Sequence, residues 1–328
     1  MNGSTPAAAD RPLLSVVMIA YNVERYVAQA LDSVLMQQLE GDYEIVVGED
    51  ASTDGTGAIV ADYARRHPRI RLLRRERNLG MNRNFMETLL AARGRFIALL
   101  DADDYWTSPH KLRAQIDFLE SHPECSICFH NAMVVYEDQA IEPHPFHVPE
   151  PRHLLSHHVP KPFSSLADLA GGNFMQTCSV VFRAGLYGDL PPWYLSMPTF
   201  DWPLHLLNAE HGLIGYIDGI MGVYRVHSGS FWSTNMAHFR RIDDVEAMID
   251  AYRMVNAYTG FRYDRTIRGQ VLPLHNRAAE LAIAAGDYRR ATSHALAALT
   301  GARRGHARFR SAALKQVVAC AAKGVAGR

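Results

Sequence analysis

Short apolar runs and helical segments alternate along the first hundred residues. Residues 13–20 (LLSVVMIA) form a nearly continuous hydrophobic run, which is typical of a strand that is buried on both faces of a sheet. Three further runs have the same character: 43–47, 70–73 and 95–100. Apolar side chains with a helical period separate these runs: at 24–38, around Val60 as far as Pro68, and at 82–92. This alternation predicts an α/β fold in which helices cover a sheet.

The pattern continues less regularly in the second half. A helix at 109–120, with Pro109 in its first turn, precedes a strand at 125–136. Residues 137–165 hold six Pro and five His without a period, which predicts a long loop. Order resumes at 176–183, followed by a helix after Asp201 and two strand candidates. The strand candidates are 213–217 and 221–226, and three helices are expected after them: 238–258, 265–285 and 287–300, the last two joined as a helical hairpin.

The composition of the chain excludes some classes of protein and indicates a compartment. The 328 residues hold 34 Lys and Arg against 34 Asp and Glu, and this balance argues against nucleic acid as the main partner. The 48% hydrophobic content excludes a disordered chain. Four irregularly spaced Cys do not make a disulfide framework, so we expect a reducing compartment and a cytoplasmic protein. We find neither a membrane-spanning apolar run nor a signal peptide in the sequence.

Acidic residues follow several of the predicted strands. In an open α/β sheet, ligands bind at the carboxyl ends of the strands, so these residues are the candidates for chemistry. Asp50 follows the second run, and Asp101 and Asp103 follow the fourth. The chain has no glycine-rich dinucleotide or triphosphate cradle, so a bound phosphate would need a metal. Two carboxylates on a turn offer hard oxygen ligands to Mg²⁺ or Mn²⁺; the alternative is that they cap a turn and are solvated.

Four segments together carry a family resemblance. They are 15–24 (SVVMIAYNVE), 49–56 (EDASTDGT), 78–84 (NLGMNRN) and 100–104 (LDADD). In this order and spacing they resemble the nucleotide-sugar-binding half of family 2 glycosyltransferases of the GT-A fold. The resemblance extends over residues 13–230 and implies a Rossmann-like mixed sheet flanked by helices. It also implies an inverting transferase that takes a sugar from a nucleotide sugar, with a UDP-linked donor favoured, in bacterial glycan or glycoconjugate biosynthesis.

The resemblance assigns residues to the donor. Tyr21 would lie against the nucleobase, and Asp50 would accept a hydrogen bond from it. Asp101 would position the ribose, and Asp103 the diphosphate-bound metal, Mn²⁺ or Mg²⁺. The full donor-binding set that it implies is Tyr21, Asn22, Glu24, Asp50, Asn78, Gly80, Met81, Asn84, Asp101 and Ala102.

Asp201 is the candidate catalytic base. It stands in residues 199–208 (TFDWPLHLLN), where the resemblance places the carboxylate of inverting enzymes. Such a base takes the proton of the acceptor hydroxyl as the sugar leaves the diphosphate. The alternative is a helix N-cap, supported by Pro203 in the first turn. The two roles are compatible, because a helix N-terminus stabilises a carboxylate and is expected to keep Asp201 ionised.

His227, in residues 224–230 (YRVHSGS), is a second candidate metal ligand or diphosphate contact. Several GT-A enzymes place a His after the last core strands in this way; a structural His is the alternative. Arg225 and Ser228 are candidates to aid the diphosphate.

The sequence predicts three parts, namely a flexible N-terminus at 1–12, a catalytic domain at 13–235 and a helical subdomain at 236–328. The catalytic domain comprises a nucleotide-sugar half (13–106) and an acceptor half (107–235). Residues 301–328 contain seven Lys and Arg and no acid, which fits either peripheral contact with the inner face of a membrane or a solvated helix face. The Ala-rich helices at 265–300 are a candidate homodimer contact.

Two rival functions stay open at this point. One is a non-catalytic nucleotide-sugar-binding scaffold that acts through the C-terminal helices, and the other is a nucleotidyltransferase. The latter would need a glycine-rich basic loop after the first strand, where this chain has Tyr21, Asn22 and Glu24. A glycan, a lipid-linked sugar and a small molecule all remain candidate acceptors.

Overall fold

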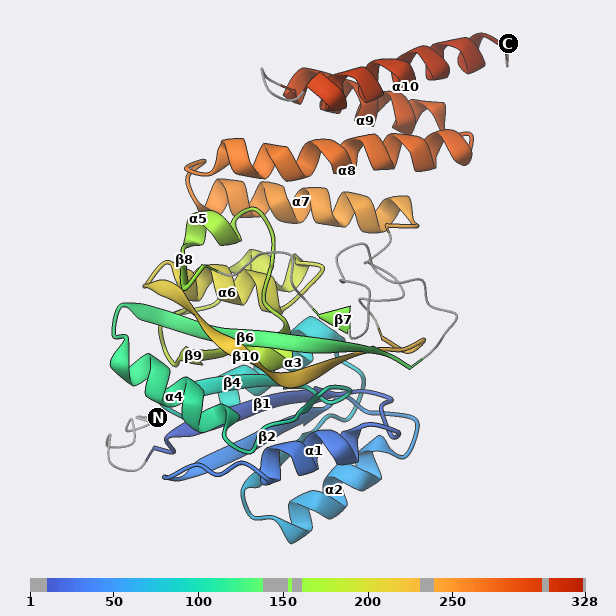
Figure 1. The fold of residues 1–328 in the computed structure, drawn as a ribbon. Coiled ribbons are helices and arrows are strands. Elements are labelled where there is room, and N and C mark those ends of the chain that lie inside the picture. The colour runs from blue at the N-terminus through green and yellow to red at the C-terminus, as the bar shows by residue number, and fades with distance from the viewer. Residues whose placement is uncertain (1–10, 138–152, 155–160, 231–238, 303–306, 327–328) are drawn as a thin grey trace, which may run out of the picture. The chain divides into compact units, whose positions relative to one another are not determined.

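The chain divides into two compact units. The computed structural model describes residues 11–137, 153–154, 161–230, 239–302 and 307–326 (Figure 1). The first unit is made of Met1–Leu166, Asn173–Pro191 and Thr199–Val226, and the second of Ala167–Gly172, Pro192–Pro198 and His227–Arg328. Most of the predicted flexible N-terminus lies outside the described residues, as do residues 231–238 around the predicted domain boundary. The predicted boundaries therefore stay predictions.

The first unit is built on a mixed sheet, as the resemblance implied. Its described strands are β1 (Leu14–Ala20), β2 (Tyr43–Glu49), β3 (Ile70–Arg74), β4 (Phe96–Asp101), β5 (Tyr105–Trp106), β6 (Cys125–Tyr136), β7 (His153–Leu154), β8 (Phe163–Ser164), β9 (Val181–Arg183) and β10 (Leu213–Val226). Their order is β3-β2-β1-β4-β9-β6-β10-β5, with β7 added beside β6 and β8 beside β10. Strands β1 to β4 run parallel, whereas β9 lies antiparallel to both β4 and β6.

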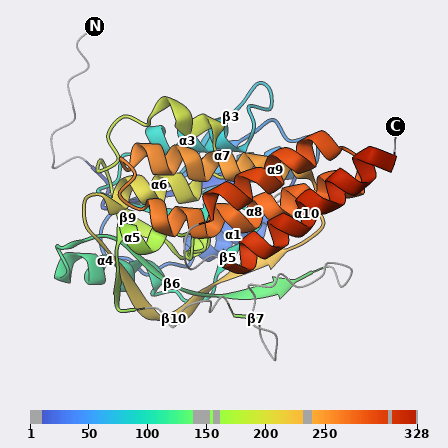
Figure 2. The same ribbon diagram turned by 90° about the horizontal axis from the view of Figure 1, so that it is seen from above.

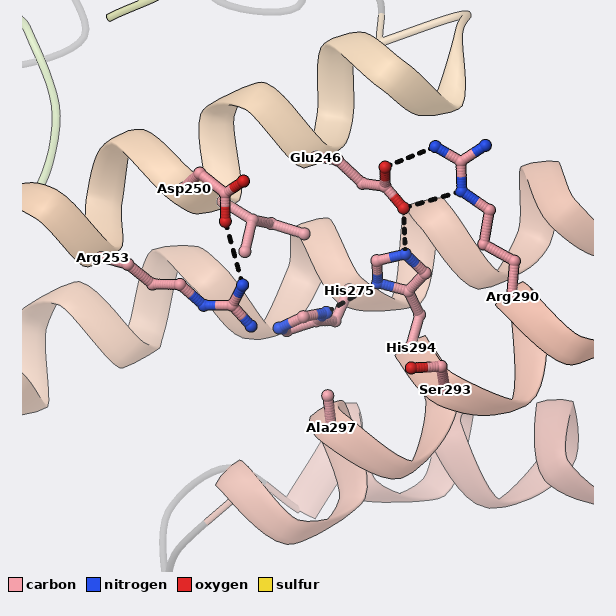
Figure 3. A pocket seen from close by; sticks show the side chains of 9 residues that line it. Glu246, Asp250, Arg253, His275, Arg290, Ser293, His294 and Ala297 are labelled. Atoms are coloured by element: carbon pink, nitrogen blue, oxygen red, sulfur yellow. Dashed lines mark hydrogen bonds and ion pairs between the residues drawn. The ribbon is translucent and has the colours of Figure 1, made fainter. Parts of the chain in front are cut away.

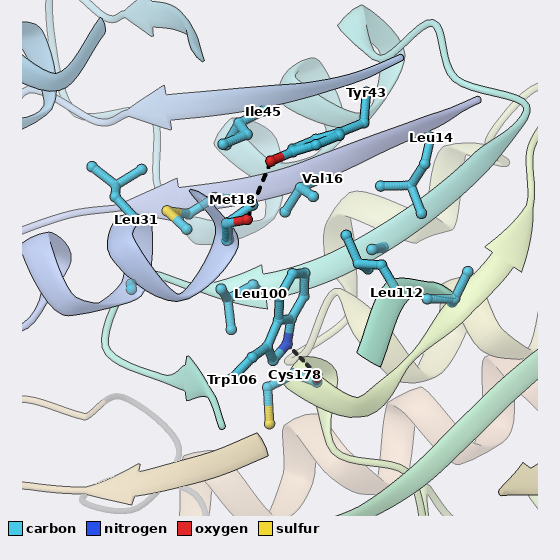
Figure 4. Close-up of a cluster of buried hydrophobic side chains, with 14 of the residues drawn as sticks. Leu14, Val16, Met18, Leu31, Tyr43, Ile45, Leu100, Trp106, Leu112 and Cys178 are labelled. Atoms are coloured by element: carbon cyan, nitrogen blue, oxygen red, sulfur yellow. Dashed lines mark hydrogen bonds between the residues drawn. The ribbon is translucent and has the colours of Figure 1, made fainter. Parts of the chain in front are cut away.

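Helices cover both faces of the parallel strands. The described helices of the first unit are α1 (Val27–Leu35), α2 (Thr56–Arg66), α3 (Met81–Ala91), α4 (Lys111–Ser121) and α6 (Asp201–Ala209), with the short 3₁₀ turn η2 (Thr177–Ser179). The short helix α5 (Leu166–Leu169), apart from Leu166, and the 3₁₀ turn η3 (Pro192–Ser196) belong to the second unit. Leu14, Val16 and Met18 of β1 pack in one cluster with side chains of α1 and α4 (Figure 4). Helix α3 packs against β1 and β2. Burial on both sides explains why β1 reads as a continuous hydrophobic run.

Two hydrogen bonds from aromatic side chains tie this cluster to its surroundings. The Tyr43 hydroxyl donates to the Val34 carbonyl at 3.4 Å, which joins β2 to α1 (Figure 4). The Trp106 indole N–H donates to the Cys178 carbonyl at 2.7 Å and joins β5 to η2. Both rings are almost fully buried, so each brings apolar area into the core while its polar atom keeps a partner.

The structure corrects two details of the sequence prediction. The two strand candidates at 213–217 and 221–226 are one strand, β10, whose pairing with β6 shifts register around Ile220. Asp218 and Gly219 there read as a turn, but they belong to this irregularity inside a continuous strand. Helix α4 begins at Lys111, after Pro109 and not around it, because the Pro109 carbonyl accepts the Gln38 backbone N–H at 2.8 Å in the preceding connection.

The second unit contains four long helices among its described residues. They are α7 (Ile242–Tyr258), α8 (Asp264–Ala284), α9 (Tyr288–Gly301) and α10 (Ala307–Ala326). Each packs against the next, as both ribbon views show (Figures 1 and 2). The predicted hairpin between α8 and α9 is confirmed: Gly286 has a φ of +77° and the Asp287 carboxylate accepts the Arg290 backbone N–H at 3.0 Å. Within the part of the chain that the structure describes, no helix is long and apolar enough to span a bilayer.

A polar network crosses the interior of this helical unit (Figure 3). The Glu246 carboxylate of α7 binds both the Arg290 guanidinium and the His294 Nε2 of α9, the latter at 2.7 Å. The His294 Nδ1 lies 2.9 Å from the Nδ1 of His275 on α8. These side chains line a cavity of about 240 Å³. Hydrogen bonds and ion pairs between these titratable side chains therefore link α7, α8 and α9.

Candidate active site

The predicted site residues gather where the parallel strands end. Ala20, the last residue of β1, pairs with Glu49 of β2, and Ile19 pairs with Asp101 of β4. The loops that follow these three strands therefore leave the sheet at the same edge. This is the edge at which open α/β sheets bind ligands.

The loops after β1 and β2 are bonded to each other. The Asn22 side-chain oxygen accepts the Thr53 backbone N–H at 2.8 Å, and the Asn22 N–H donates to the Ser52 hydroxyl at 3.1 Å. The Glu24 carboxylate accepts the Gly55 N–H at 2.6 Å. Tyr21 precedes them with 46% of its surface exposed. Asn22 and Glu24 thus shape the loop pair, and Tyr21 is available to a ligand.

Asp50 organises the turn that leads into α3. One carboxylate oxygen accepts the Leu79 backbone N–H at 2.8 Å, and the other accepts the Gly80 N–H at 3.0 Å. The Asn78 side chain also accepts the Gly80 N–H. Gly80 has a φ of +83°, which a residue with a side chain adopts only with strain. The structure therefore brings together Asp50, Asn78 and Gly80, which the resemblance assigns to the donor. Met81, also assigned to the donor, is the first residue of α3.

Asn84 is brought to the interior of the fold. Its side-chain NH₂ donates to the Gly48 carbonyl at 2.8 Å, and its oxygen accepts the Arg75 Nε–H at 3.0 Å. Only 1% of its surface is exposed. A Cβ on Gly48 would lie 2.6 Å from the Asn84 side-chain oxygen, so glycine at that position lets α3 approach β2. A direct contact of Asn84 with a nucleoside would require these bonds to open, and its observed role is to hold α3 on β2.

Arg225 holds the acidic turn after β4. The turn consists of Asp101, Ala102, Asp103 and Asp104 and is closed by the Asp104 N–H, which donates to the Asp101 carbonyl at 3.0 Å. The Arg225 backbone N–H donates to the Asp104 carboxylate at 2.8 Å, and its guanidinium donates to the Asp103 carbonyl. The same guanidinium also binds the side chains of Gln29 and Glu137.

Only 4% of the surface of Arg225 is exposed, and its guanidinium points inward in this structure. Its expected role at a diphosphate stays a prediction. Its side chain holds the backbone of Asp103, the residue that the resemblance assigns to the metal. No spacing in the sequence indicates a bond between Arg225 and Asp103, because the two positions are 122 residues apart.

Asp201 is the first residue of α6, with the N-cap position held by Phe200. One carboxylate oxygen accepts the Trp202 backbone N–H at 2.7 Å. The other accepts the Asn173 side-chain N–H at 2.8 Å and lies 3.4 Å from the Thr177 hydroxyl. Asn173 and Thr177 were not predicted, because they follow an irregular stretch with no period or motif.

The charges of the acidic turn and of Asp201 act on one another. Burial, and then the negative charges of Asp103 and Asp201, raise the pKa of Asp101 well above its usual range. Burial also raises the pKa of Asp201, against the lowering effect of the Trp202 N–H and the Thr177 hydroxyl. Burial thus opposes the stabilising effect expected from the helix N-terminus, and the ionised state of Asp201 stays a prediction. The predicted base and the predicted donor carboxylates therefore share one site in the first unit.

His227 is the first residue of the second unit after β10. The Nδ1 of its ring accepts the Gly229 backbone N–H at 3.2 Å. The backbone N–H of His227 donates to the Ser230 hydroxyl at 3.3 Å. Because His227 belongs to the other unit, its role beside Asp103 stays a prediction. The described part of the chain has no cluster of three or more His, Cys, Asp or Glu side chains that could by itself enclose a metal ion.

Comparison with known proteins identifies the family. A sequence model of glycosyl transferase family 2 matches residues 15–184, which is more than half of the chain. The chain belongs to glycosyltransferase family 2. An uncharacterised protein of Mycobacterium tuberculosis is 36% identical over 79% of this chain and 72% of its own length. The Bacillus subtilis glycosyltransferase EpsE is 34% identical over 62% of this chain and 69% of its own.

Solved structures agree with the fold expected of this glycosyltransferase. Staphylococcus aureus TarS (residues 1–349), solved with UDP-GlcNAc, aligns with a TM-score of 0.61 at 16% identity, over 96% of this chain and 92% of that one. A mannosyltransferase of Pyrobaculum calidifontis, solved with GDP-Man and Mn²⁺, aligns with a TM-score of 0.54 at 17% identity, over 96% and 87%. At these identities the likeness concerns the fold, and it confirms the GT-A expectation.

Proposed function

We propose that this glycosyltransferase moves a sugar from a nucleoside-diphosphate sugar to an acceptor hydroxyl with inversion at the anomeric carbon, and that Asp201 is the general base. The observation that carries the proposal is the position of Thr177, whose hydroxyl lies 3.4 Å from the Asp201 carboxylate and also interacts with Asp101 at the carboxyl end of β4. A base beside the donor carboxylates is where an acceptor hydroxyl must be deprotonated.

The proposed reaction is a single in-line displacement. The acceptor oxygen forms a bond to the anomeric carbon as the bond from that carbon to the diphosphate oxygen breaks. The leaving nucleoside diphosphate takes the electron pair, and the acceptor proton passes to an oxygen of Asp201. Burial raises the pKa of Asp201, which brings it closer to the range in which a carboxylate is an effective base.

Asp101 and Asp103 suit a divalent cation, and we propose Mn²⁺ or Mg²⁺. Their oxygens are hard ligands, and the repulsion that raises the pKa of Asp101 is what a cation would relieve. Mg²⁺ is commonly held by one or two carboxylates together with substrate phosphates and water, so no closed protein cage is needed. When bound, the cation supplies positive charge for the departing diphosphate.

The donor loops support a nucleotide with its base near Tyr21. The ring is 46% exposed and follows β1 directly, and the neighbouring Asp50 holds the turn at Gly80. Asp50 is 3% exposed, so it supports the nucleobase site chiefly by holding this turn, and a bond from a nucleobase N–H to one of its remaining lone pairs requires the turn to shift. We favour a UDP-linked donor, which TarS also binds in its solved complex.

The test is an assay for release of nucleoside diphosphate. The protein is incubated with UDP-GlcNAc, UDP-glucose and GDP-mannose in turn, with Mn²⁺ or Mg²⁺ and a panel of hydroxyl acceptors. We expect turnover with at least one donor, loss of it in EDTA, and a product whose anomeric configuration is opposite to that of the donor. Release of pyrophosphate would indicate a nucleotidyltransferase instead. Binding of a donor without any turnover would indicate a scaffold.

Asp201→Asn tests the base. Removing a general base typically lowers kcat about 100- to 10,000-fold. Donor binding by calorimetry is expected to stay within about threefold, because the nucleotide loops belong to other elements. Asp218→Asn, at an exposed position of β10, is the matched control and keeps wild-type activity. An Asp201→Asn enzyme that turns over normally would remove Asp201 from this role.

For the helical unit we propose peripheral contact with an anionic membrane through α10. Leu314 and Val318 of α10 are 55% and 61% exposed and lie one turn apart, with Arg310 and Lys315 also exposed. Apolar side chains flanked by basic ones are typical of interfacial helices. Co-sedimentation with phosphatidylglycerol vesicles but not with phosphatidylcholine vesicles is expected, and Leu314→Glu should abolish it. A homodimer through the Ala-rich helices is a separate proposal, which analytical ultracentrifugation tests.

A further inference from the structure

We propose that Asn173 and Thr177 are positioning residues for Asp201: they fix the direction from which its carboxylate takes the acceptor proton. The proposal rests on the function proposed for Asp201 above. All the residues involved belong to the first unit. They come from two stretches of the chain: Asn173 and Thr177 lie just before η2 and in it, and Asp201 lies at the start of α6.

The Asn173 amide has only one orientation that satisfies its neighbours. Its oxygen accepts the Met175 backbone N–H at 3.1 Å, so its NH₂ group is the part that faces Asp201. Turning the amide over would set an NH₂ against the Met175 N–H and an oxygen against the Asp201 carboxylate. Both contacts would then be repulsive. Asn173 is thus a directed donor toward one oxygen of Asp201.

Thr177 approaches the same Asp201 oxygen from η2. Its hydroxyl lies 3.4 Å from that oxygen and also interacts with Asp101. A hydroxyl has a single proton, so Thr177 donates to one carboxylate at a time. It therefore stands between the proposed base and the carboxylate assigned to the donor.

Three hydrogen bonds anchor the 3₁₀ turn η2, which carries Thr177, and the residue after it. The Cys178 carbonyl accepts the Trp106 indole N–H at 2.7 Å, and the Ser179 carbonyl accepts the Gln115 side-chain N–H at 2.8 Å. The Val180 carbonyl accepts the Leu99 backbone N–H at 3.2 Å. Three bonds from β5, α4 and β4 thus fix η2, and a side chain on such a support keeps its geometry.

Together these contacts hold the Asp201 carboxylate in one orientation. The Trp202 N–H binds one of its oxygens, and Asn173 and Thr177 both address the other. The Thr199 hydroxyl also interacts with this carboxylate. A carboxylate whose orientation is fixed in this way meets the acceptor hydroxyl from a defined direction. Misplacing a reacting group by about 1 Å can cost about 100-fold in rate, so fixing this direction matters for kcat.

The test compares variants that remove or keep each donor. Asn173→Ala and Thr177→Val each remove a bond to Asp201, whereas Thr177→Ser keeps the hydroxyl. Asn173 is exposed and Thr177 half-buried, so these changes are expected to preserve the fold, which circular dichroism and the Tm check. Thr300→Val, at an exposed hydroxyl of α9 in the other unit, is the matched control.

We expect Asn173→Ala and Thr177→Val to lower kcat about 10- to 100-fold, the usual effect of losing a hydrogen bond to a charged group. The KM for the nucleotide sugar is expected to stay within about threefold, and Thr177→Ser to recover most of kcat. A purely structural role would lower stability and leave kcat per folded molecule unchanged. Unchanged kcat in Asn173→Ala and Thr177→Val, with Asp201→Asn inactive, would overturn this inference alone. An active Asp201→Asn would instead overturn the proposed base.

Discussion

Acidification is expected to weaken the helical unit through His275. This side chain is 5% exposed, and its Nδ1 lies 2.9 Å from the Nδ1 of His294 (Figure 3). One proton can sit between the two nitrogens, but two cannot. Burial, followed by the charges of His294 and Arg253, lowers the pKa of His275 to about 4, although Asp250 and Glu246 oppose the shift.

The sign and size follow from proton linkage. The unfolded chain takes up a proton at His275 near pH 6.5, whereas the folded chain does so near pH 4. The stability that depends on neutral His275 is therefore complete above pH 6.5 and is lost as the pH falls toward 4. Each pH unit in this window is worth about 1.4 kcal/mol, so the loss between pH 7 and pH 5 is about 2 kcal/mol.

A second loss begins at lower pH. The Arg290 guanidinium, with the His294 ring, lowers the pKa of Glu246 to about 2. Stability from this carboxylate is present above about pH 4.5 and disappears as the pH falls toward 2. About a third of the Glu246 side chain is exposed (33%), so solvent screening makes this contribution smaller than the shift suggests. Glu246 therefore adds no loss between pH 7 and pH 5. Burial also lowers the pKa of His130 and of His205 in the first unit to about 3, so these two histidines contribute in the same interval, and a variant of His275 is needed to separate its share.

Urea unfolding at pH 7, 6 and 5, followed by far-ultraviolet circular dichroism, measures the effect. His275→Gln removes the titrating ring but keeps a side chain that can donate to His294. We expect the wild type to lose about 2 kcal/mol more than this variant between pH 7 and pH 5. His211→Gln, at an exposed position of the other unit, should behave as the wild type does. Equal losses in wild type and His275→Gln would refute the reasoning.

Two further substitutions probe the first unit. Asp50→Asn sets an amide donor against the backbone N–H of Leu79 or of Gly80. We therefore expect the KM for the nucleotide sugar to rise about tenfold, while kcat changes less. Saturation kinetics measure both constants, and an unchanged KM would show that Asp50 has no part in donor binding. Arg225→Lys removes buried bonds around the acidic turn and should cost about 3 kcal/mol in urea unfolding, against less than about 1 kcal/mol for Arg253→Lys in an exposed ion pair.

The parallel part of the sheet was predicted well because β1, β2 and β4 are almost completely buried, while the edge strand β3 is half-buried but keeps an apolar run. β1 to β4 each occupy an apolar run, and helices with a clear period lie between them. The short strands β5, β7 and β8 were missed, since two residues cannot show a period. β10 was divided in two because Asp218 and Gly219 look like a turn, whereas a long partner strand carries the pairing across them.

The site was predictable only where its residues follow strands. Asp50 and Asp101 stand directly at strand ends, so their meeting at one edge follows from parallel topology. Asn173 and Thr177 reach Asp201 through a loop and a 3₁₀ turn, whose course depends on tertiary bonds such as that from Trp106 to Cys178. The direction of the pKa shift at Asp201 also escaped prediction, because burial is a property of the packed structure.

Although the whole chain has equal numbers of acidic and basic residues, the acidic turn after β4 has a buried basic neighbour, Arg225, which matters for how the donor is bound. The basic side chain nearest in sequence to His227, Arg225, directs its guanidinium inward to the Asp103 carbonyl and to Gln29 and Glu137. Its positive charge thereby stabilises the acidic turn through the backbone of Asp103. In the proposed function, the diphosphate of the donor lies beside the carboxylates of Asp101 and Asp103. Because like charges repel strongly in a partly buried site, the proposed divalent cation is the component that lets an acidic turn bind an anionic donor.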